Sequence, residues 1–440
     1  MPQHDEEMNR RREKREAMRK KREAEQRRLK ITLILAAVVL VLCGAGIFVI
    51  ARNAGVQPAM SLSADVEEPQ QQTEAATEAP KETTGKRSST TTIHIKAAGD
   101  LNITSTVVDS GLATNGYNYT RAFLDVASTL ADADLTVMNF EGNVYGTDYG
   151  TSTSSAPKEL LDGLRSAGVD LLQTANSYSI SNGLIGLSST LTAIRSAGLQ
   201  PLGSYASSAE FKQSKGYTIC EVQGIKVAFV AFTKGVGGMG MPAGNEDCVN
   251  LLYLDYDSTY EKVDKDGISA ILEAVAAEKP DITIAMLHWG SEYNDSVSET
   301  QESIVTLMKK KGVDVIIGTH PHLVQKIDYD KSAGTLVAYS LGDFFGDASR
   351  GGSNYSIILD IEITKDSDAQ TTKVTDYSYT PIYTLTSSES QGDYSYSRVV
   401  RIEEAMLAYE SNFLDKITET AYKNMEYALT RIEDRISGKG

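Results

Sequence analysis

Three of the five histidines in this 440-residue chain stand where an apolar segment ends. His288 follows the segment ITIAML, and His320 and His322 follow DVIIGT with one proline between them. Ligand-binding residues of α/β sheets gather at the carboxyl ends of strands, and neutral imidazole is the commonest metal ligand. One histidine at a strand end is usually structural. Two such ends, one of them carrying His-x-His, favour a metal site.

Oxygen donors follow three further segments of the same kind. Asp100 follows IHIKAAG, Glu141 follows LTVMNF, and Asn176 follows LLQTA. Oxygen and nitrogen donors together suit zinc, manganese or iron, whereas oxygen alone would favour calcium or magnesium. Two such ions about 3.5–4 Å apart polarise a phosphoryl or similar ester group. The series predicts a site for one or two divalent transition-metal ions, and the alternative is that all of these side chains are structural.

The elements that must position these residues alternate between short β-rich segments and helical patterns, which indicates an α/β core. The predicted strands are Thr92–Ala98, Leu135–Asn139, Leu171–Ala175, Tyr217–Val222, Lys226–Phe232, Ile282–Leu287, Val313–Ile317, Leu336–Ser340 and Tyr355–Ile363. The predicted helices are Tyr119–Leu130, Pro157–Ala167, Leu187–Ala197, Gly267–Ala277 and Ser298–Lys311. Gln223-Gly224, between two strand-like segments, predicts a hairpin turn.

The C-terminal segment, residues 386–440, has a helical pattern. Between Ile402 and Ile432, apolar residues recur every three or four positions, which predicts one long amphipathic helix or two short ones. Such a helix could bind a partner, but packing across its own domain is the preferred interpretation.

Charge and cysteine content exclude several protein classes. Residues 1–30 hold twelve Lys/Arg and seven Asp/Glu, so the other 410 residues hold 31 basic and 52 acidic side chains and a net charge of −21. A body this acidic repels phosphate backbones, so we expect no nucleic-acid partner. Three cysteines exclude a disulfide framework or a zinc ribbon. Cys220 and Cys248 could pair outside a cell.

A membrane anchor is predicted near the N-terminus. Ile31–Ala51 is a run of 21 residues without a charge, enough to span about 30 Å of hydrocarbon as a helix. The basic segment 1–30 directly before it favours a cytoplasmic N-terminus. A cleaved signal peptide is the alternative, but no convincing cleavage site follows. Residues 52–90 have almost no large apolar side chains and predict a disordered linker to an outer domain.

Six motifs, in this order, resemble the capsule-synthesis CapA family, also called poly-γ-glutamate synthesis proteins. They are AAGD (Ala97–Asp100), MNFEG (Met138–Gly142), TAN (Thr174–Asn176), LHWGSEY (Leu287–Tyr293), GTHPHLVQ (Gly318–Gln325) and SLGDF (Ser340–Phe344). The resemblance covers about Ile93 to Phe345. The family is similar to calcineurin-like metallophosphatases, which implies a four-layer α/β/β/α sandwich in residues 91–385.

The resemblance also implies roles for single residues. Asp100 would be a first metal ligand, Glu141 a carboxylate that bridges two ions, and His288, His320 and His322 the imidazole ligands. The side chains of Trp289, Glu292 and Tyr293 would shape a substrate pocket beside His288, although simple packing is the alternative for Trp289 and Tyr293.

The chain departs from the family pattern at two places. The family usually has A-N-N-H-x-x-D-x-G where this chain has Ala175–Gly183, so Ser177, Tyr178 and Ser181 replace Asn, His and Asp. Asn176 keeps a metal ligand if the family uses the first Asn. Tyr178 could donate a proton, but its ordinary pKa near 10 makes it a poor acid-base catalyst at neutral pH. Asp343 replaces an Asn of the family and could face the metals or a substrate, or cap a loop.

Three functions are compatible with these observations. The first is a single-pass cell-membrane protein whose main domain is extracellular and assists the synthesis, export or attachment of an anionic polymer of the poly-γ-glutamate type. Its partners would be a membrane complex for polymer synthesis and the polymer itself. The second is an active metal-dependent phosphoesterase or amide hydrolase. The third is a non-catalytic binding or scaffold domain, which the altered Ala175–Gly183 segment favours.

Overall fold

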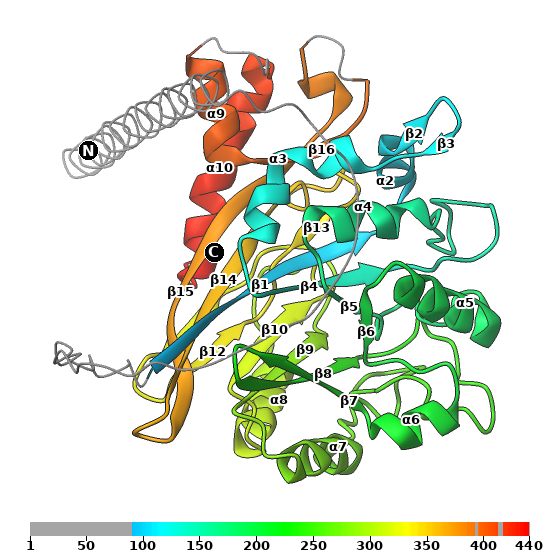
Figure 1. Cartoon of the computed structure of the whole chain (residues 1–440). Coiled ribbons are helices and arrows are strands. Elements are labelled where there is room, and N and C mark those ends of the chain that lie inside the picture. The colour runs from blue at the N-terminus through cyan, green and yellow to red at the C-terminus, as the bar shows by residue number, and fades with distance from the viewer. Residues whose placement is uncertain (1–89, 392–394, 412–416, 440) are drawn as a thin grey trace, which may run out of the picture. The chain divides into compact units, whose positions relative to one another are not determined.

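The computed structural model describes residues 90–391, 395–411 and 417–439, which belong to one compact unit, Thr84–Gly440 (Figure 1). The predicted α/β class is confirmed by two sheets and the helices around them. The predicted cytoplasmic segment, membrane helix and linker lie outside the described residues, except for Thr90, the last residue of the predicted linker, which is the first residue of β1 (Thr90–Asn102). Among the helices of the described part, none combines the length and apolar character that crossing a membrane requires.

The first sheet has eight strands in the order β16-β15-β14-β1-β4-β5-β6, with β13 paired to β1. Its strands are β1 (Thr90–Asn102), β4 (Leu135–Glu141), β5 (Leu171–Gln173), β6 (Gln200–Leu202), β13 (Asp343–Phe345), β14 (Tyr355–Asp366), β15 (Thr371–Leu385) and β16 (Arg398–Arg401). Strands β1, β4, β5 and β6 run parallel, so their carboxyl ends lie at one edge. The long hairpin of β14 and β15 pairs antiparallel with β1.

The second sheet has six strands in the order β11-β12-β10-β9-β8-β7. They are β7 (Tyr217–Val222), β8 (Ile225–Thr233), β9 (Ile282–His288), β10 (Val315–Thr319), β11 (Ile327–Asp330) and β12 (Thr335–Ala338). The four central strands are parallel. Gln223 and Gly224 form the predicted turn between β7 and β8, each with positive φ (48° and 79°), as a two-residue hairpin of this kind requires.

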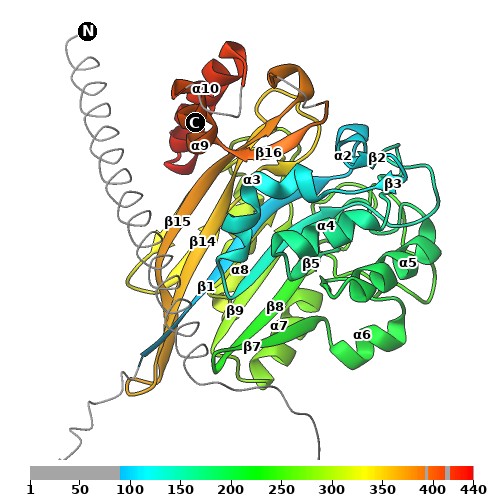
Figure 2. The same cartoon turned by 45° about the horizontal axis from the view of Figure 1, so that its top comes forward.

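The two sheets pack face to face, and helices cover their outer faces (Figure 2). The largest apolar cluster joins inward-facing residues of β1 and β14 to those of β8, β9 and β10. A second cluster joins the first sheet to α3 (Thr120–Ala131), α4 (Glu159–Ala167) and α5 (Gly183–Ser196). A third joins the second sheet to α7 (Lys265–Ala277) and α8 (Glu299–Lys310). Shorter elements are α2 (Ser105–Ser110), β2 (Leu112–Ala113), β3 (Gly116–Tyr117), α6 (Ser208–Ser214) and η1 (Ser387–Glu389).

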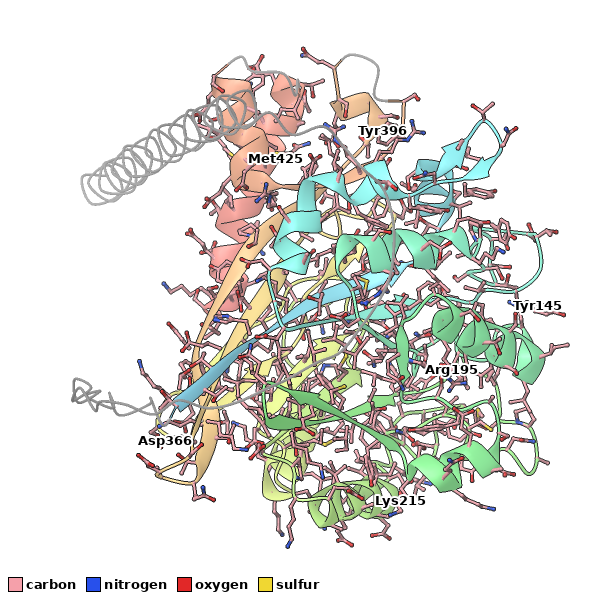
Figure 3. All side chains as sticks on the ribbon, viewed as in Figure 1. Tyr145, Arg195, Lys215, Asp366, Tyr396 and Met425 are labelled. Carbon is pink, nitrogen blue, oxygen red and sulfur yellow. The ribbon has the colours of Figure 1, made fainter. Side chains whose placement is uncertain are left out.

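The C-terminal segment 386–440 is helical only in part: it begins with η1 and with β16, which pairs with β15 in the first sheet, and then forms the helices α9 (Ile402–Glu410) and α10 (Glu419–Ile436). Their apolar faces belong to the inter-sheet cluster, and Met425, fully buried on α10, is marked in Figure 3. The prediction of helices packed across their own domain is therefore confirmed. Cys220 on β7 and the buried Cys248 are both free thiols, so the pairing considered from the sequence does not form.

Candidate metal centre

The predicted metal-site residues lie at the carboxyl ends of strands from both sheets. Asp100 lies near the end of β1 and Glu141 is the last residue of β4. His288 is the last residue of β9, and His320 directly follows β10. Because the two sheets pack face to face with these ends at one edge, residues about 220 positions apart meet: His320 N donates to Asp100 Oδ2 at 3.0 Å.

Six buried side chains form three overlapping groups in which one ligand atom of each member lies within 4.8 Å of the others. The groups are Glu141, His320 and His322; Asp100, His322 and Asp343; and Asp100, Glu141 and His288. We call these six residues the acid–histidine cluster. It contains every predicted ligand except Asn176, together with Asp343.

Two atoms of the cluster fit a cation better than they fit a dry protein interior. Glu141 Oε2 and His320 Nδ1 are buried and have no hydrogen-bond partner. Leaving a buried acceptor unsatisfied costs about 1–3 kcal/mol, and more for a charged group. A divalent cation between a carboxylate oxygen and an imidazole nitrogen would satisfy both atoms, so the cluster could hold a divalent metal ion.

The backbone is specialised where it carries the histidines. His320 and His322 have φ values of 93° and 58°, a region that costs a residue with a side chain about 1–3 kcal/mol. Gly99 permits a close approach on the opposite side, because a Cβ there would lie 1.8 Å from the Gly342 carbonyl oxygen. That approach sets Asp343, the next residue after Gly342, beside His322 with Asp343 Oδ1 2.7 Å from His322 Nδ1.

Further buried polar side chains form hydrogen bonds with residues of the cluster. Asn139 Nδ2 donates to Asp100 Oδ1 at 2.6 Å and lies 3.4 Å from His288 Nδ1. Thr319 Oγ1 lies 3.2 Å from the same His288 nitrogen and donates to Gln173 Oε1 at 3.1 Å. These three supporting residues were not among the predicted site residues. Their signal was a buried polar side chain within or at the end of an apolar strand segment.

Asn176 and Ser177 adjoin the cluster through other contacts. The Asn176 amide donates to Asn139 Oδ1 at 3.1 Å and to the Phe140 carbonyl at 2.7 Å, and its own Oδ1 accepts from Tyr178 N at 3.1 Å. Ser177 N and Oγ lie 3.2 and 3.0 Å from His288 Nε2. The metal-ligand role of Asn176 remains a prediction, since its side chain already bridges two neighbouring segments.

Burial dominates the electrostatics of the cluster. It raises the pKa of Asp100 to about 6 and also raises the pKa values of Glu141 and Asp343. Burial lowers the pKa values of His288 and His320, which keeps both imidazoles in the neutral form that binds metal. The pKa of His322 is also lowered by burial, but the surrounding carboxylates outweigh this and raise it well above the usual value.

A cavity of about 630 Å³ opens beside the cluster and reaches His320. Tyr178 and Glu292 line it, in keeping with their predicted places, and so do Ser177 and Lys234. Burial raises the pKa of Tyr178, so its hydroxyl stays protonated at neutral pH. Lys234 was missed because a lone lysine after a strand is an ordinary surface residue in sequence.

Tyr293 and Trp289 lie differently from each other. Tyr293 is 37 % exposed and stacks on His322 with ring centroids 5.3 Å apart, so it stands at the rim of the cluster. Trp289 is fully buried, stacks on Tyr339 at 5.9 Å and donates from Nε1 to the Tyr339 carbonyl at 2.9 Å. Of the two interpretations of Trp289, a substrate pocket or simple packing, its burial supports packing. Its side chain points into the core between the second sheet and its helices.

The curated proteins that this chain resembles include two CapA proteins. Capsule biosynthesis protein CapA of Bacillus anthracis is 28 % identical over 241 residues, which are 53 % of this chain and 55 % of the relative. PGA biosynthesis protein CapA of Bacillus subtilis (strain 168) is 27 % identical over 190 residues, 43 % of this chain and 46 % of the relative. The chain thus spans about half the length of the curated relatives it matches.

Among solved structures, the calcineurin-like phosphoesterase YfkN from Bacillus subtilis is similar, with a TM-score of 0.39 and 15 % identity, covering 78 % of this chain and 98 % of that one. Residues 94–348, more than half of the chain, match the family described as Bacterial capsule synthesis protein PGA_cap. This span contains the whole acid–histidine cluster. The chain belongs to the bacterial capsule synthesis family PGA_cap.

Proposed function

We propose that this protein is a membrane-anchored component of cell-surface polymer production. Its globular part assists the synthesis, export or attachment of an anionic polymer of the poly-γ-glutamate type, and it binds one or two divalent transition-metal ions. Membership of the capsule synthesis family supports the polymer class. The uncharged segment Ile31–Ala51, with basic residues before it, supports an anchor whose N-terminus is cytoplasmic and whose globular part is extracellular.

The observation that carries the proposal is the meeting of five residues from four separate motifs in one buried cluster beside a cavity. Asp100, Glu141 and the three histidines would hold the metal, with Asp343 as a further oxygen donor or as the orienting partner of His322. Manganese, zinc and iron suit this mixed donor set. A bound ion would polarise a phosphoryl or carbonyl oxygen of a substrate in the cavity.

Residues of the chain would orient the histidine ligands and contact the substrate. Asn139 and Thr319 fix the His288 ring, and Asp343 fixes the His322 ring through Nδ1. Tyr178, on the cavity wall, presents a protonated hydroxyl that can donate a hydrogen bond but gives up its proton slowly, because its pKa is raised. The site is thus built to bind an ester or amide and is poorly equipped for fast proton transfer.

Disrupting the gene in the producing organism tests the polymer role. We expect cell-bound anionic polymer to fall on disruption, to return with the wild-type chain, and to stay low with a chain that carries both His320→Ala and His322→Ala. Polymer that is unchanged by disruption would refute the role. Polymer restored by the double variant would show that the role does not need the metal cluster.

The cavity beside the cluster favours a second candidate function, a metal-dependent phosphoesterase or amide hydrolase. The purified full-length chain with added Mn²⁺, assayed against generic phosphoesters and amides, discriminates between the two. Turnover that His320→Ala abolishes would support the hydrolase. No turnover with any of manganese, zinc or iron would leave the assembly role as the better account.

A further inference from the structure

Lys234 is a cationic residue of the cavity wall that is not a member of the acid–histidine cluster. It directly follows β8, and its backbone N donates to the carbonyl of His288, a cluster residue, at 2.7 Å. This bond fixes the Lys234 backbone next to the end of β9, beside the cluster. Its side chain then lines the cavity together with Tyr178, Glu292 and His320.

Two neutral groups hold the Lys234 side chain in place. Its Nζ donates to the Gly290 carbonyl oxygen at 2.7 Å and lies 4.6 Å from the centre of the Tyr260 ring. Gly235 lets the ring come this close, because a Cβ there would lie 2.8 Å from Tyr260 Cε1. An ammonium group has three hydrogens, so at least one remains to donate into the cavity after these contacts.

The charge of the molecule makes this cation significant. The chain outside residues 1–30 carries a net charge of −21, which opposes the approach of a polyanion. The cluster adds three buried carboxyl groups, those of Asp100, Glu141 and Asp343. A substrate with carboxylate or phosphate oxygens therefore needs local positive charge to stay in the cavity, and Lys234 supplies it next to His320.

We propose that Lys234 forms an oxyanion-binding subsite of the cavity, where its ammonium group pairs with a carboxylate or phosphate oxygen of the substrate while the reacting part of the substrate faces the acid–histidine cluster. The inference rests on the proposed function and specifies its substrate class as anionic. Glu292 on the same wall would favour a substrate that also presents a hydrogen-bond donor, such as an amide N–H.

The test compares Lys234→Met with the wild-type full-length chain in binding assays with two ligands, a γ-linked glutamate oligomer and inorganic phosphate. Losing a hydrogen bond to a charged group costs about ten- to a hundredfold in affinity, so we expect Lys234→Met to weaken at least one ligand by that factor. Loss of oligomer binding alone identifies a carboxylate, and loss of phosphate binding alone identifies a phosphate. Lys234→Arg, which keeps the charge, should retain part of the affinity.

Lys310→Met is the matched control, because Lys310 is an exposed lysine on α8, away from the cavity walls. It should leave both affinities unchanged. Metal content measured on each variant separates this inference from the proposed function: Lys234→Met should keep its metal. Equal affinities of wild type and Lys234→Met, or no binding of either ligand by wild type, would overturn the subsite even if metal binding is intact.

Discussion

Asp343 is the residue that most changes the view of the site gained from the motifs. Its carboxylate lies 2.7 Å from His322 Nδ1 and belongs to one of the three groups that could hold a metal ion. Whether Asp343 is a metal ligand or only orients the ring, it acts on the His322 imidazole, which belongs to two of the three groups. A carboxylate at this point also explains why the pKa of His322 rises although burial lowers it.

Asp343→Asn keeps the size of the side chain and removes its charge. Losing the partner of a metal-binding histidine typically costs about 10–100-fold in metal affinity, and we expect a loss of that size for Mn²⁺ or Zn²⁺ measured by calorimetry. Asp368→Asn, an exposed change in the turn of the β14–β15 hairpin, should leave the affinity unchanged. Equal affinities of Asp343→Asn and wild type would show that Asp343 neither binds nor orients.

Tyr178 supports a prediction of gained activity. The tyrosine lines the cavity, but its pKa is raised by burial, so it exchanges protons poorly near neutral pH. A histidine has an ordinary pKa near 6.5, and a placed acid-base group contributes about 10²–10⁴-fold in rate. We expect Tyr178→His to raise turnover of a generic phosphoester with Mn²⁺ at least tenfold (about 1.4 kcal/mol of barrier). Tyr178→Phe, the control, should not raise it, and an unchanged rate in Tyr178→His would mean that proton transfer does not limit turnover.

At the residue scale, the sequence predicts the candidate metal ligands better than it predicts the residues that hydrogen-bond to them or line the cavity. Asp100, Glu141 and the histidines follow strand-like segments, and the rule that strand ends bind ligands is enough to select them. Asn139 shows only the weaker signal of a polar residue within an apolar segment, and Lys234 resembles an ordinary surface lysine. Their roles come from which strand lies next to which, and this pairing appears only when both sheets are assembled.

The elements place the cluster by two devices, parallel strand ends and tight turns. Both sheets offer their carboxyl ends at one edge, and the positive φ values of His320 and His322 turn the chain so that both imidazoles point back into it. The helix patterns predicted α3, α4, α7 and α8 to within two residues, because the periodicity of their buried faces is regular. The pattern for α5 placed its start at Leu187, four residues after the observed start at Gly183.

The long hairpin shows where sequence pattern falls short. Strand β14 was predicted as Tyr355–Ile363 and runs to Asp366, while β15 (Thr371–Leu385) was not predicted at all. In its first half, β15 alternates exposed polar residues with half-buried threonines and tyrosines, so it lacks a strong apolar period. Its pairing with β14 and the packing of α9 and α10 against it supply the stability that its own sequence does not indicate.

Helix α10 also holds a loop beside the cluster, which gives a prediction at this scale. The buried Arg435 donates from Nε to Asp295 Oδ2 at 3.2 Å, and Asp295 lies in the loop that follows His288. Arg435→Met should lower the free energy of unfolding by about 1–3 kcal/mol in urea, because it removes a charged hydrogen bond. Lys423→Met, which removes an exposed ion pair on the same helix, should leave the midpoint unchanged, and an equal effect of both changes would contradict this role of Arg435.

At the scale of the whole molecule, charge is divided between the basic segment 1–30 and the acidic remainder of the chain. The twelve Lys/Arg of residues 1–30 suit the anionic inner surface of a membrane, and the acidic side chains that follow the proposed anchor would disfavour contact of the globular part with an anionic surface. In the proposed function, the metal cluster would lie outside the cell, where a polymer could reach its cavity.

Fractionation tests the anchor. We expect the full-length chain in membranes, resistant to extraction by high salt and released by detergent, because burying about twenty apolar residues far outweighs surface charge. Protease added to intact cells stripped of their wall should digest the globular part and leave the N-terminal segment. Recovery of a full-length chain in the soluble fraction would contradict a membrane anchor.

The most direct test of the central claim is the metal content of the freshly purified full-length chain, measured by elemental analysis. The cluster predicts one or two equivalents of manganese, zinc or iron per chain, lost when His320 and His322 are both changed to alanine while the far-ultraviolet circular dichroism stays that of a folded protein. A wild-type chain that takes up none of these metals, or a double variant that retains them in full, would contradict the account.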